Sequence, residues 1–244
     1  MAVRRDRVAA VVEHLPESSR ISASIIIPVF NESSELGNTL KQLSQSLRGN
    51  CDIEIILSDG DSTDNSPEIA KHYSCRVIST STGRASQMNA ASAQARGDWL
   101  VFLHADSKLP DNWQDQLRQS NQWGFFPVKL SGEHWQLRIV ESLINLRSRV
   151  SKIATGDQGL YFRRSLFQEL GGYPDIPIME DVAISKLARQ KTAPSIGTQP
   201  VTTSSRRWQQ HGIIKTVLLM WSLRLAYFLG VDPVRLHRIY YPNP

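Results

Sequence analysis

The first hundred residues alternate between short apolar segments typical of buried strands and longer segments with helical spacing. Residues 25–30 form a continuous, largely β-branched run, as expected for a strand that is covered on both faces of a parallel sheet. Leucines then recur at helical spacing over residues 36–47. The same pattern predicts further strands at 53–57, 76–79 and 99–104, and helices at 66–72 and 83–96. Such alternation predicts an α/β fold with a mainly parallel, Rossmann-like sheet and right-handed crossovers.

The alternation becomes irregular after Pro110. We expect a helix to about residue 121, a strand near 124–130, a long helix over 134–152, a strand over 160–163 and a helix over 180–189. The 244 residues contain no repeat, Ser/Gly linker or low-complexity tract. We therefore predict a single domain over residues 21–244 behind an N-terminal extension, 1–20, with a ligand-binding half at 21–109 and a second half at 110–244.

The charge balance suits an anionic partner but does not identify one. The formal net charge is +5 and the pI is near 9.4, values that favour nucleic acid, acidic lipid headgroups or the pyrophosphate of a nucleotide. The arginines are scattered, and no stripe interleaves them with aromatic residues. We therefore expect no nucleic-acid partner and a diffuse basic surface.

Two further features bear on the compartment. Only Cys51 and Cys75 occur, which argues against a disulfide framework and fits a reducing, cytoplasmic location. Residues 212–231 are strongly apolar but contain Lys215 and Arg224, each costing about 2.5 to 3.5 kcal/mol near a bilayer centre. A buried or interfacial helix is expected there, with peripheral contact at the inner face of the membrane left open and a buried core helix favoured.

Polar side chains follow the predicted strands at the points where those strands end. Glu32, Asp59 and Asp106 come after the first, second and fourth strands, and the loop before Gly83 would open nearby. Ligands bind outside the carboxyl ends of such strands. This edge of the sheet, hereafter the rim, is therefore the predicted site.

Asp106 directly follows the strand at 99–104, so its carboxylate would be held rigidly at the rim. A carboxylate there can bind a divalent cation that neutralises a nucleoside diphosphate. Taken alone, Asp106 is better explained as a solvated turn residue, but the other rim residues favour the cation site. Asp59 can accept hydrogen bonds from a nucleobase or ribose. Residues 62–64 are explained by a turn and a helix cap, and the segment lacks the ligand spacing of a calcium loop.

Three other segments can serve the same ligand. Gly83 and Arg84 precede a helix, where backbone donors and a guanidinium can meet pyrophosphate; Gln87 alternatively lies on an exposed polar face. Glu180 and Asp181 open a helix and point about 100° apart, so one is expected to face the pocket as a base, the alternative being favourable charge at a helix start. Residues 206–208 pair guanidinium groups with an aromatic ring.

Taken together, residues 27–32, 58–64 and 104–106 resemble the family 2 glycosyltransferases of the GT-A fold in order and spacing. Residues 83–90, 156–159, 178–181 and 206–208 resemble a bacterial subgroup associated with radical-SAM and selenoprotein-type domains. The resemblance extends from about residue 24 to residue 231.

The resemblance implies an inverting transfer from a nucleotide-diphosphate sugar, with UDP as the leading nucleotide, to an unidentified hydroxyl acceptor, and a lipid-linked acceptor is left open. Mg or Mn would lie under the phosphates, held by Asp106, and Asp181 would be the base with Glu180 as its supporting neighbour. His104 stands where many relatives have a first aspartate. The expected cofactor-binding residues are Pro28, Phe30, Glu32, Asp59, Gly83, Arg84, Gln87, His104, Ala105, Asp106, Asp157, Arg207 and Trp208.

Two other functions remain open at this point. A sugar-phosphate nucleotidyltransferase uses a similar rim, but no glycine-rich loop with a basic residue follows the first strand. A non-catalytic nucleotide-binding module would bind nucleotide without transferring a sugar.

Overall fold

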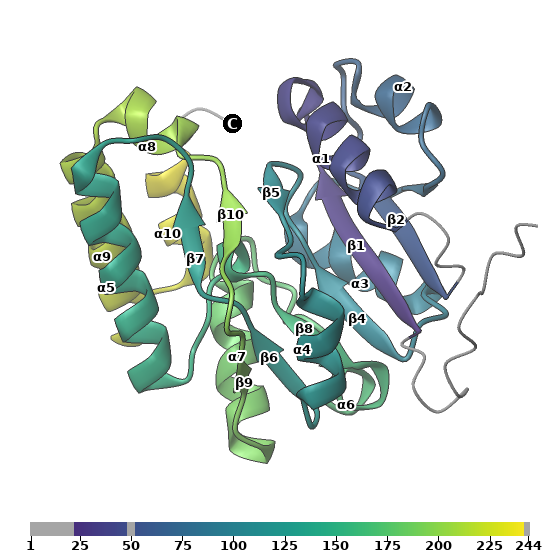
Figure 1. Ribbon diagram of the computed structural model, residues 1–244. Coiled ribbons are helices and arrows are strands. Elements are labelled where there is room, and N and C mark those ends of the chain that lie inside the picture. The colour runs from purple at the N-terminus through teal and green to yellow at the C-terminus, as the bar shows by residue number, and fades with distance from the viewer. Residues whose placement is uncertain (1–21, 48–51, 242–244) are drawn as a thin grey trace, which may run out of the picture.

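The computed structural model describes residues 22–47 and 52–241, and the predicted N-terminal extension lies outside this part of the chain. Within the described residues, a seven-stranded sheet has the order β3-β2-β1-β4-β8-β6-β9, and a three-stranded sheet has the order β5-β10-β7. Figure 1 shows the parallel strands on one side of the molecule and the long helices α5 and α9 on the other, with β7 and β10 between them. The predicted α/β class, with a mainly parallel central sheet flanked by helices, is confirmed.

The first half follows the predicted alternation closely. Its elements are β1 (Ala23–Val29), α1 (Ser33–Ser46), β2 (Ile53–Asp59), α2 (Ser66–Lys71), β3 (Arg76–Ser79), α3 (Arg84–Gln94) and β4 (Trp99–Phe102). Strand β1 pairs in parallel with both β2 and β4, and β2 pairs in parallel with β3. The carboxyl ends of these strands consequently meet at one edge of the sheet.

The second half is more irregular than the sequence predicts. It contains β5 (Ser107–Lys108), α4 (Trp113–Gln119), β6 (Trp123–Phe125), β7 (Val128–Leu130), α5 (Trp135–Ser151), the 3-10 turn η2 (Gly156–Gln158), β8 (Tyr161–Arg163), α6 (Arg164–Glu169) and α7 (Glu180–Lys191). It ends with β9 (Ser195–Ile196), β10 (Val201–Thr203), α8 (Arg206–His211), α9 (Ile213–Phe228) and α10 (Pro233–Tyr240). Strand β8 runs antiparallel to β4 and β6.

The single strand predicted near residues 124–130 is wrong. Strand β6 belongs to the large sheet and β7 to the small one, with Phe126 and Pro127 between them. Pro127 has no N–H to donate to a ladder, and the N–H of Phe126 donates to the carbonyl of Gln158 instead. The chain thus changes sheets at a proline.

Alternate side chains of β1 explain why helices cover both faces of the sheet. Ile25 and Ile27 belong to the hydrophobic cluster that includes Leu36 and Leu40 of α1. Ile26 belongs to a second cluster, which includes Met88 of α3. A strand covered on both faces requires a continuous apolar run, as residues 25–30 provide.

Gly97, just before β4, lies against the main chain of β1. A β-carbon at this position would lie 2.5 Å from the carbonyl carbon of Ala23 and the amide nitrogen of Ser24. Backbone atoms of a paired strand cannot move aside, so we expect Gly97→Ala to lower the free energy of unfolding by about 1 to 3 kcal/mol. Gly37→Ala in α1 is the control, because its nearest neighbour would be 3.7 Å away; we expect it to raise stability by about 0.5 to 1 kcal/mol. Urea denaturation measures both, and a Gly97→Ala protein of wild-type stability would contradict the packing.

No helix in the described ranges is long and apolar enough to cross a membrane. The favoured core-helix prediction for residues 212–231 is nevertheless wrong, because only Thr216 and Leu223 of α9 are buried. Helix α9 packs with one side against α5, α8 and α10 and leaves large apolar side chains in solvent.

Candidate active site

Asp59 ends β2 at the rim, beside the end of β1. Its side chain is only 6% exposed, and its Oδ2 accepts a hydrogen bond from the N–H of Ser62 at 3.2 Å. Its Oδ1 is buried and has no hydrogen-bond partner among the described residues. A buried carboxylate oxygen without a partner costs free energy that a bound donor group would recover. Nearby, Pro28 is buried within β1, whereas Phe30 is 47% exposed just beyond it.

The loop after β2 is built around Asp64 and Asn31. Asn31 has a positive φ of 56°, and its Oδ1 accepts the N–H of Thr63 at 2.8 Å. Asp64 accepts the N–H of Ser33 and that of Ser66, both at 2.9 Å, which are the first residues of α1 and α2. The helix cap predicted for residues 62–64 is present, although it serves two helices.

Asp64 therefore gives a pH-dependent contribution to stability. Partial burial opposes ionisation, but hydrogen bonds from Ser66 and Ser33 lower the pKa of Asp64 from 3.8 to about 2. Because the folded-state pKa is depressed, the stabilisation is complete above the unfolded pKa and is lost as the pH falls from about 4 to about 2. We expect Asp64→Asn to cost about 1 to 2 kcal/mol at neutral pH, with the difference from wild type shrinking across that window. Denaturation at several pH values measures it, and a constant difference would contradict the assignment.

Gln87 supports the rim from within the protein. Its side chain is buried, and Nε2 donates to the carbonyls of Val29 and Ser58 at 2.7 and 2.8 Å. The alternative of an exposed polar face is wrong for this residue. Gln87 ties together the ends of β1 and β2, so its influence on a ligand would be exerted through these strands.

Arg84 begins α3 and reaches across the rim to α7. Gly83 precedes it with a positive φ of 140°, and Arg84 Nε lies 3.3 Å from Glu180 Oε1. The carboxylate of Glu180 raises the pKa of Arg84, so the guanidinium is charged at any working pH. Arg84 retains about a third of its exposure, which leaves a fixed cation available to a phosphate.

Glu180 and Asp181 both contribute to this neighbourhood, contrary to the expectation that only one would face the site. Burial, with the charge of Asp181 adding to it, raises the pKa of Glu180 against the opposing effect of Arg84. The Oε2 of Glu180 is buried without a partner in the part of the chain that the structure covers. Asp181 Oδ2 accepts the N–H of Gly156 at 2.7 Å, and its Oδ1 accepts the N–H of Val182.

His104 and Asp157 bring the segment after β4 next to Asp181. His104 Nδ1 lies 3.2 Å from Asp157 Oδ1. Burial alone would lower the pKa of His104, but the hydrogen bond and charge of Asp157 raise it above its ordinary value. Burial likewise opposes ionisation of Asp157, whose pKa is lowered by His104. A β-carbon on Gly156 would lie 2.5 Å from His104 Nε2 and 3.7 Å from Asp181 Oδ2, so the side chains of His104 and Asp181 both lie against this glycine.

Asp106 lies at the same rim, two residues beyond His104, with Ala105 buried between them. Its Oδ1 accepts hydroxyl hydrogen bonds from Ser107 and Thr203 at 3.3 and 3.4 Å. Burial, and next the negative charge of Asp106, raises the pKa of Glu32. Asp106 and Glu32 thus place two interacting negative charges at the rim, which a bound cation would stabilise.

The described residues contain no cluster of three or more His, Cys, Asp or Glu side chains able to hold a metal ion alone. Asp106 therefore fits a cation that takes most of its ligands from the phosphates of a bound nucleotide and from water. Mg²⁺ is commonly held in this way, with only one or two protein carboxylates.

Arg206 joins the two halves of the chain, a role that sequence reasoning did not predict for it. Its Nη2 lies 3.3 Å from Glu32 Oε2, and its Nη1 donates to Ser34 Oγ at 2.5 Å. Arg206 belongs to the basic segment 206–208, but the sequence does not reveal a partner so far away. Trp208 is half-buried against the core, and the side chain of Arg207 lies outside the described residues.

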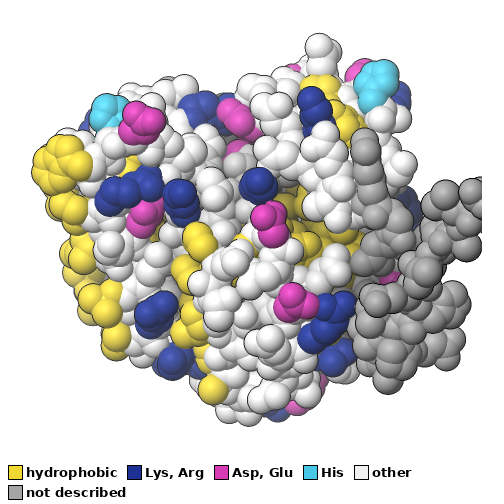
Figure 2. Space-filling view, viewed as in Figure 1, with side chains coloured by type: hydrophobic (Ala, Val, Ile, Leu, Met, Phe, Trp, Pro, Cys, Tyr) yellow, Lys and Arg dark blue, Asp and Glu magenta, His cyan; other side chains and the backbone are white. Residues whose placement is uncertain are grey.

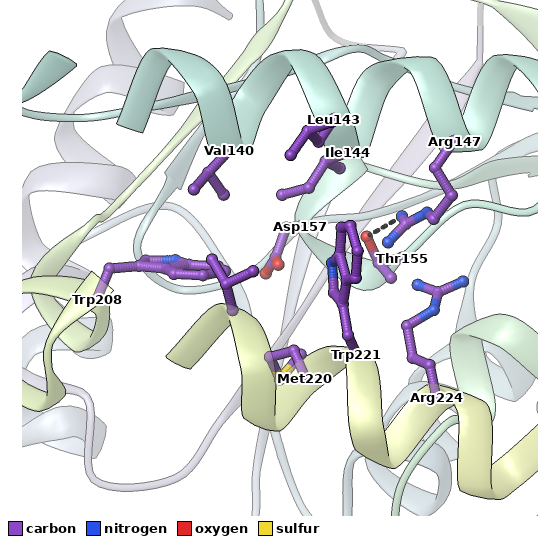
Figure 3. Close-up of a pocket in the computed structure, with 11 residues that line it drawn as sticks. Val140, Leu143, Ile144, Arg147, Thr155, Asp157, Trp208, Met220, Trp221 and Arg224 are labelled. Carbon is purple, nitrogen blue, oxygen red and sulfur yellow. Dashed lines mark hydrogen bonds between the residues drawn. The ribbon is translucent and has the colours of Figure 1, made fainter. Parts of the chain in front are cut away.

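Arg147 and Arg224 were also missed as site neighbours. They line a slot between α5 and α9 that also contains Thr155, Asp157 and Trp208 (Figure 3). The available signal was Arg224 itself, a charge in the middle of a strongly apolar helix.

Comparison with known proteins shows what this chain resembles. Residues 24–121 match the family described as "Glycosyl transferase family 2". A PGL/p-HBAD biosynthesis glycosyltransferase of Mycobacterium bovis is 29% identical over 62% of each chain. An undecaprenyl-phosphate 4-deoxy-4-formamido-L-arabinose transferase of Proteus mirabilis is 25% identical over 57% of this chain and 47% of the relative.

Solved structures show the same fold. S. aureus TarS superposes with a TM-score of 0.62 at 17% identity, covering 76% of this chain and 61% of that one. A mannosyltransferase from Pyrobaculum calidifontis, in complex with GDP-Man and Mn²⁺, gives 0.58 at 20% identity over 76% of this chain and 56% of that one.

Residues 24–121 thus resemble glycosyltransferase family 2, and the chain has the GT-A-like fold of the solved structures. The chain spans 62% of the length of the M. bovis relative.

Proposed function

We propose that the protein transfers a sugar from a nucleotide-diphosphate sugar, with UDP as the preferred nucleotide, to a hydroxyl acceptor with inversion. The observation that carries this proposal is the convergence of Asp106, His104 and Asp181 at one rim. His104 and Asp106 come from the segment after β4, whereas Asp181 comes from the start of α7, and Gly156 lies between His104 and Asp181. The sequence likeness to the radical-SAM and selenoprotein-associated subgroup belongs to the same proposal.

Donor recognition is assigned to the ends of β1 and β2 and to Arg84. The unpartnered Oδ1 of Asp59 would accept a hydrogen bond from the base or ribose. Phe30 would offer an exposed ring to the nucleoside, with Pro28 and Glu32 beside it. Arg84, held by Glu180, would meet the pyrophosphate next to Gly83. We also assign Ala105, Arg207 and Trp208 to the binding of the donor.

Asp181 is assigned as the general base. As the acceptor oxygen bonds to the anomeric carbon, the bond from that carbon to the leaving phosphate oxygen breaks, and the acceptor proton passes to Asp181. The main-chain N–H of Gly156 holds the Asp181 carboxylate in place. Glu180 fixes Arg84, which stabilises the negative charge of the departing nucleoside diphosphate.

Asp106 would hold a Mg²⁺ or Mn²⁺ ion, which neutralises negative charge on the leaving diphosphate. Mn²⁺ accompanies the nucleotide in the P. calidifontis mannosyltransferase and in a M. tuberculosis glucosyl-3-phosphoglycerate synthase of the same fold. His104, with its raised pKa and its partner Asp157, would add positive charge beside the same phosphates.

We further propose that residues 21–109 bind the donor, that residues 110–244 bind the acceptor, and that the enzyme works at the cytoplasmic side of the membrane. A lipid-linked acceptor is suggested by the undecaprenyl-phosphate transferase relative. The apolar surface of α9 supports the same choice.

The test is incubation of the purified protein with UDP- and GDP-sugars in the presence of Mn²⁺. We expect slow release of the nucleoside diphosphate from one donor, because water replaces the missing acceptor. Pyrophosphate release from a nucleoside triphosphate and a sugar phosphate would instead support a nucleotidyltransferase. Tight nucleotide binding with neither hydrolysis nor transfer would support a binding module.

A further inference from the structure

Helix α9 carries a continuous stripe of exposed apolar side chains. The stripe consists of Ile214, Leu218, Trp221, Leu225 and Phe228, which are 56% to 82% exposed. Their spacing of four and three residues places them on one face of the helix. At 1.5 Å per residue the stripe is about 20 Å long. Water covers this face in the isolated chain, which is unfavourable for so much apolar surface.

Helix α5 adds a second stripe beside the first. Trp135, Ile139, Leu146 and Val150 are each at least half exposed, and α5 contacts α9. Figure 2 shows hydrophobic side chains gathered along the edge of the molecule at which Figure 1 places these two helices. We call the two stripes together the docking face.

A slot between α5 and α9 contains two guanidinium groups. Figure 3 shows the side chains of Arg147 and Arg224 near each other at one end of the slot, close to Trp221. Arg147 Nε and Arg224 Nη1 are buried and have no hydrogen-bond partner in the described ranges. Burial, and next the charge of Arg224, lowers the pKa of Arg147 to about 10. Two like charges with unpartnered N–H groups form a site for an anion.

The slot leads to the candidate active site. Asp157 lines the slot and also pairs with His104 at the rim. The negative charge of Asp181 acts to raise the pKa of both Arg147 and Arg224. An anion held by the two arginines would therefore lie next to the proposed general base.

The positive charge around the docking face favours an anionic bilayer over a second copy of the chain as its partner. A second copy of the chain would bring another pair of slot arginines to the same surface, which is unfavourable. An anionic bilayer supplies the opposite charge, at about 1 kcal/mol for each nearby basic residue. Residues 206–241 contain one acidic residue, Asp232, and the following basic residues: Arg206, Arg207, Lys215, Arg224, Arg235 and Arg238.

We propose that the docking face lies on a bilayer and that the slot receives the anionic headgroup of the lipid that accepts the sugar. This proposal rests on the proposed function for the transfer step, in which a headgroup hydroxyl loses its proton to Asp181 and the nucleoside diphosphate leaves. The apolar stripes would be buried at the level of the headgroups and upper acyl chains, as in amphipathic helices that lie in the interface.

Flotation of the full chain with vesicles tests the docking face. We expect the protein to float with mixed phosphatidylcholine and phosphatidylglycerol vesicles about tenfold better than with phosphatidylcholine alone. Leu218→Glu combined with Phe228→Glu should abolish flotation. Val77→Glu, at an exposed apolar residue on β3, should float like wild type. Failure of the wild type to float, or flotation of the double variant, would overturn the proposal, as would a dimer that this variant dissociates.

Removing the charges of the two slot arginines tests whether the slot binds an anionic headgroup. Arg147→Gln with Arg224→Gln should lower the preference for phosphatidylglycerol, whereas the two Lys substitutions should keep most of it. Equal preferences in the Gln and wild-type proteins would overturn the headgroup site. Nucleotide-dependent thermal stabilisation of the same samples reports the donor site separately. If a nucleotide gave no thermal stabilisation while the protein still floated with vesicles, the proposed function would be contradicted but the docking face would not. A labelled sugar recovered only in water-soluble products would overturn the lipid acceptor.

Discussion

Asp181→Asn is expected to lower kcat by about 10² to 10⁴ while changing the affinity for the donor little. An amide cannot take the proton that the acceptor hydroxyl loses, and general-base contributions are of this size. The side chain is held by the N–H groups of Gly156 and Val182, and the amide oxygen can still accept one of these bonds. Sugar transfer under saturating donor gives kcat, and titration with nucleotide gives the affinity.

Asp175→Asn is the matched control for Asp181, because Asp175 is an exposed carboxylate on the segment that leads into α7. It should keep wild-type turnover. A melting midpoint near that of the wild type would show that Asp181→Asn is folded. If this variant were folded and retained wild-type turnover, Asp181 would not be the base.

Asp106→Asn is expected to lower kcat/KM by at least about 100-fold and to remove the dependence of nucleotide binding on Mn²⁺. Asp106 is the proposed protein ligand of the cation, and a metal that stabilises a leaving group contributes several kcal/mol to the transition state. The same substitution removes a negative charge near Glu32, whose pKa should then fall toward its ordinary value. Calorimetric titration of UDP with and without Mn²⁺ measures the first effect.

Asp111→Asn serves as the control, since Asp111 is exposed and lies five residues further along the same stretch of chain. It should bind nucleotide and metal as the wild type does. Unchanged Mn²⁺ dependence in Asp106→Asn would mean that the cation, if used, is held elsewhere.

The parallel half of the fold was predictable because its signals are local. The apolar run at 25–30 and the leucines at helical spacing that follow it predict, from local sequence alone, which side chains are buried. The rim also follows from topology, because the carboxyl ends of parallel strands lie at one edge. The small sheet was not predictable, since β5, β7 and β10 have two or three residues each and depend on partners remote in sequence.

The roles of individual side chains were harder to predict from the sequence. Gln87 looks like a surface residue from its spacing, but its hydrogen bonds to two strand ends keep it buried. The pairing of Arg84 with Glu180, and of Arg206 with Glu32, joins residues far apart in the chain. The exposure of α9 was misjudged because apolar composition alone does not say whether another surface covers a helix.

The central claim is that the rim binds a nucleoside diphosphate together with a divalent cation. The most direct measurement is the thermal unfolding of the wild-type chain with UDP and with GDP, each with and without Mn²⁺. Ligand at about 100 times its dissociation constant stabilises by about 2.7 kcal/mol, which corresponds to a rise in Tm of about 5 to 10 °C for a chain of this size. We predict such a rise with UDP only when Mn²⁺ is present; no rise with either nucleotide, with or without the metal, would contradict the account.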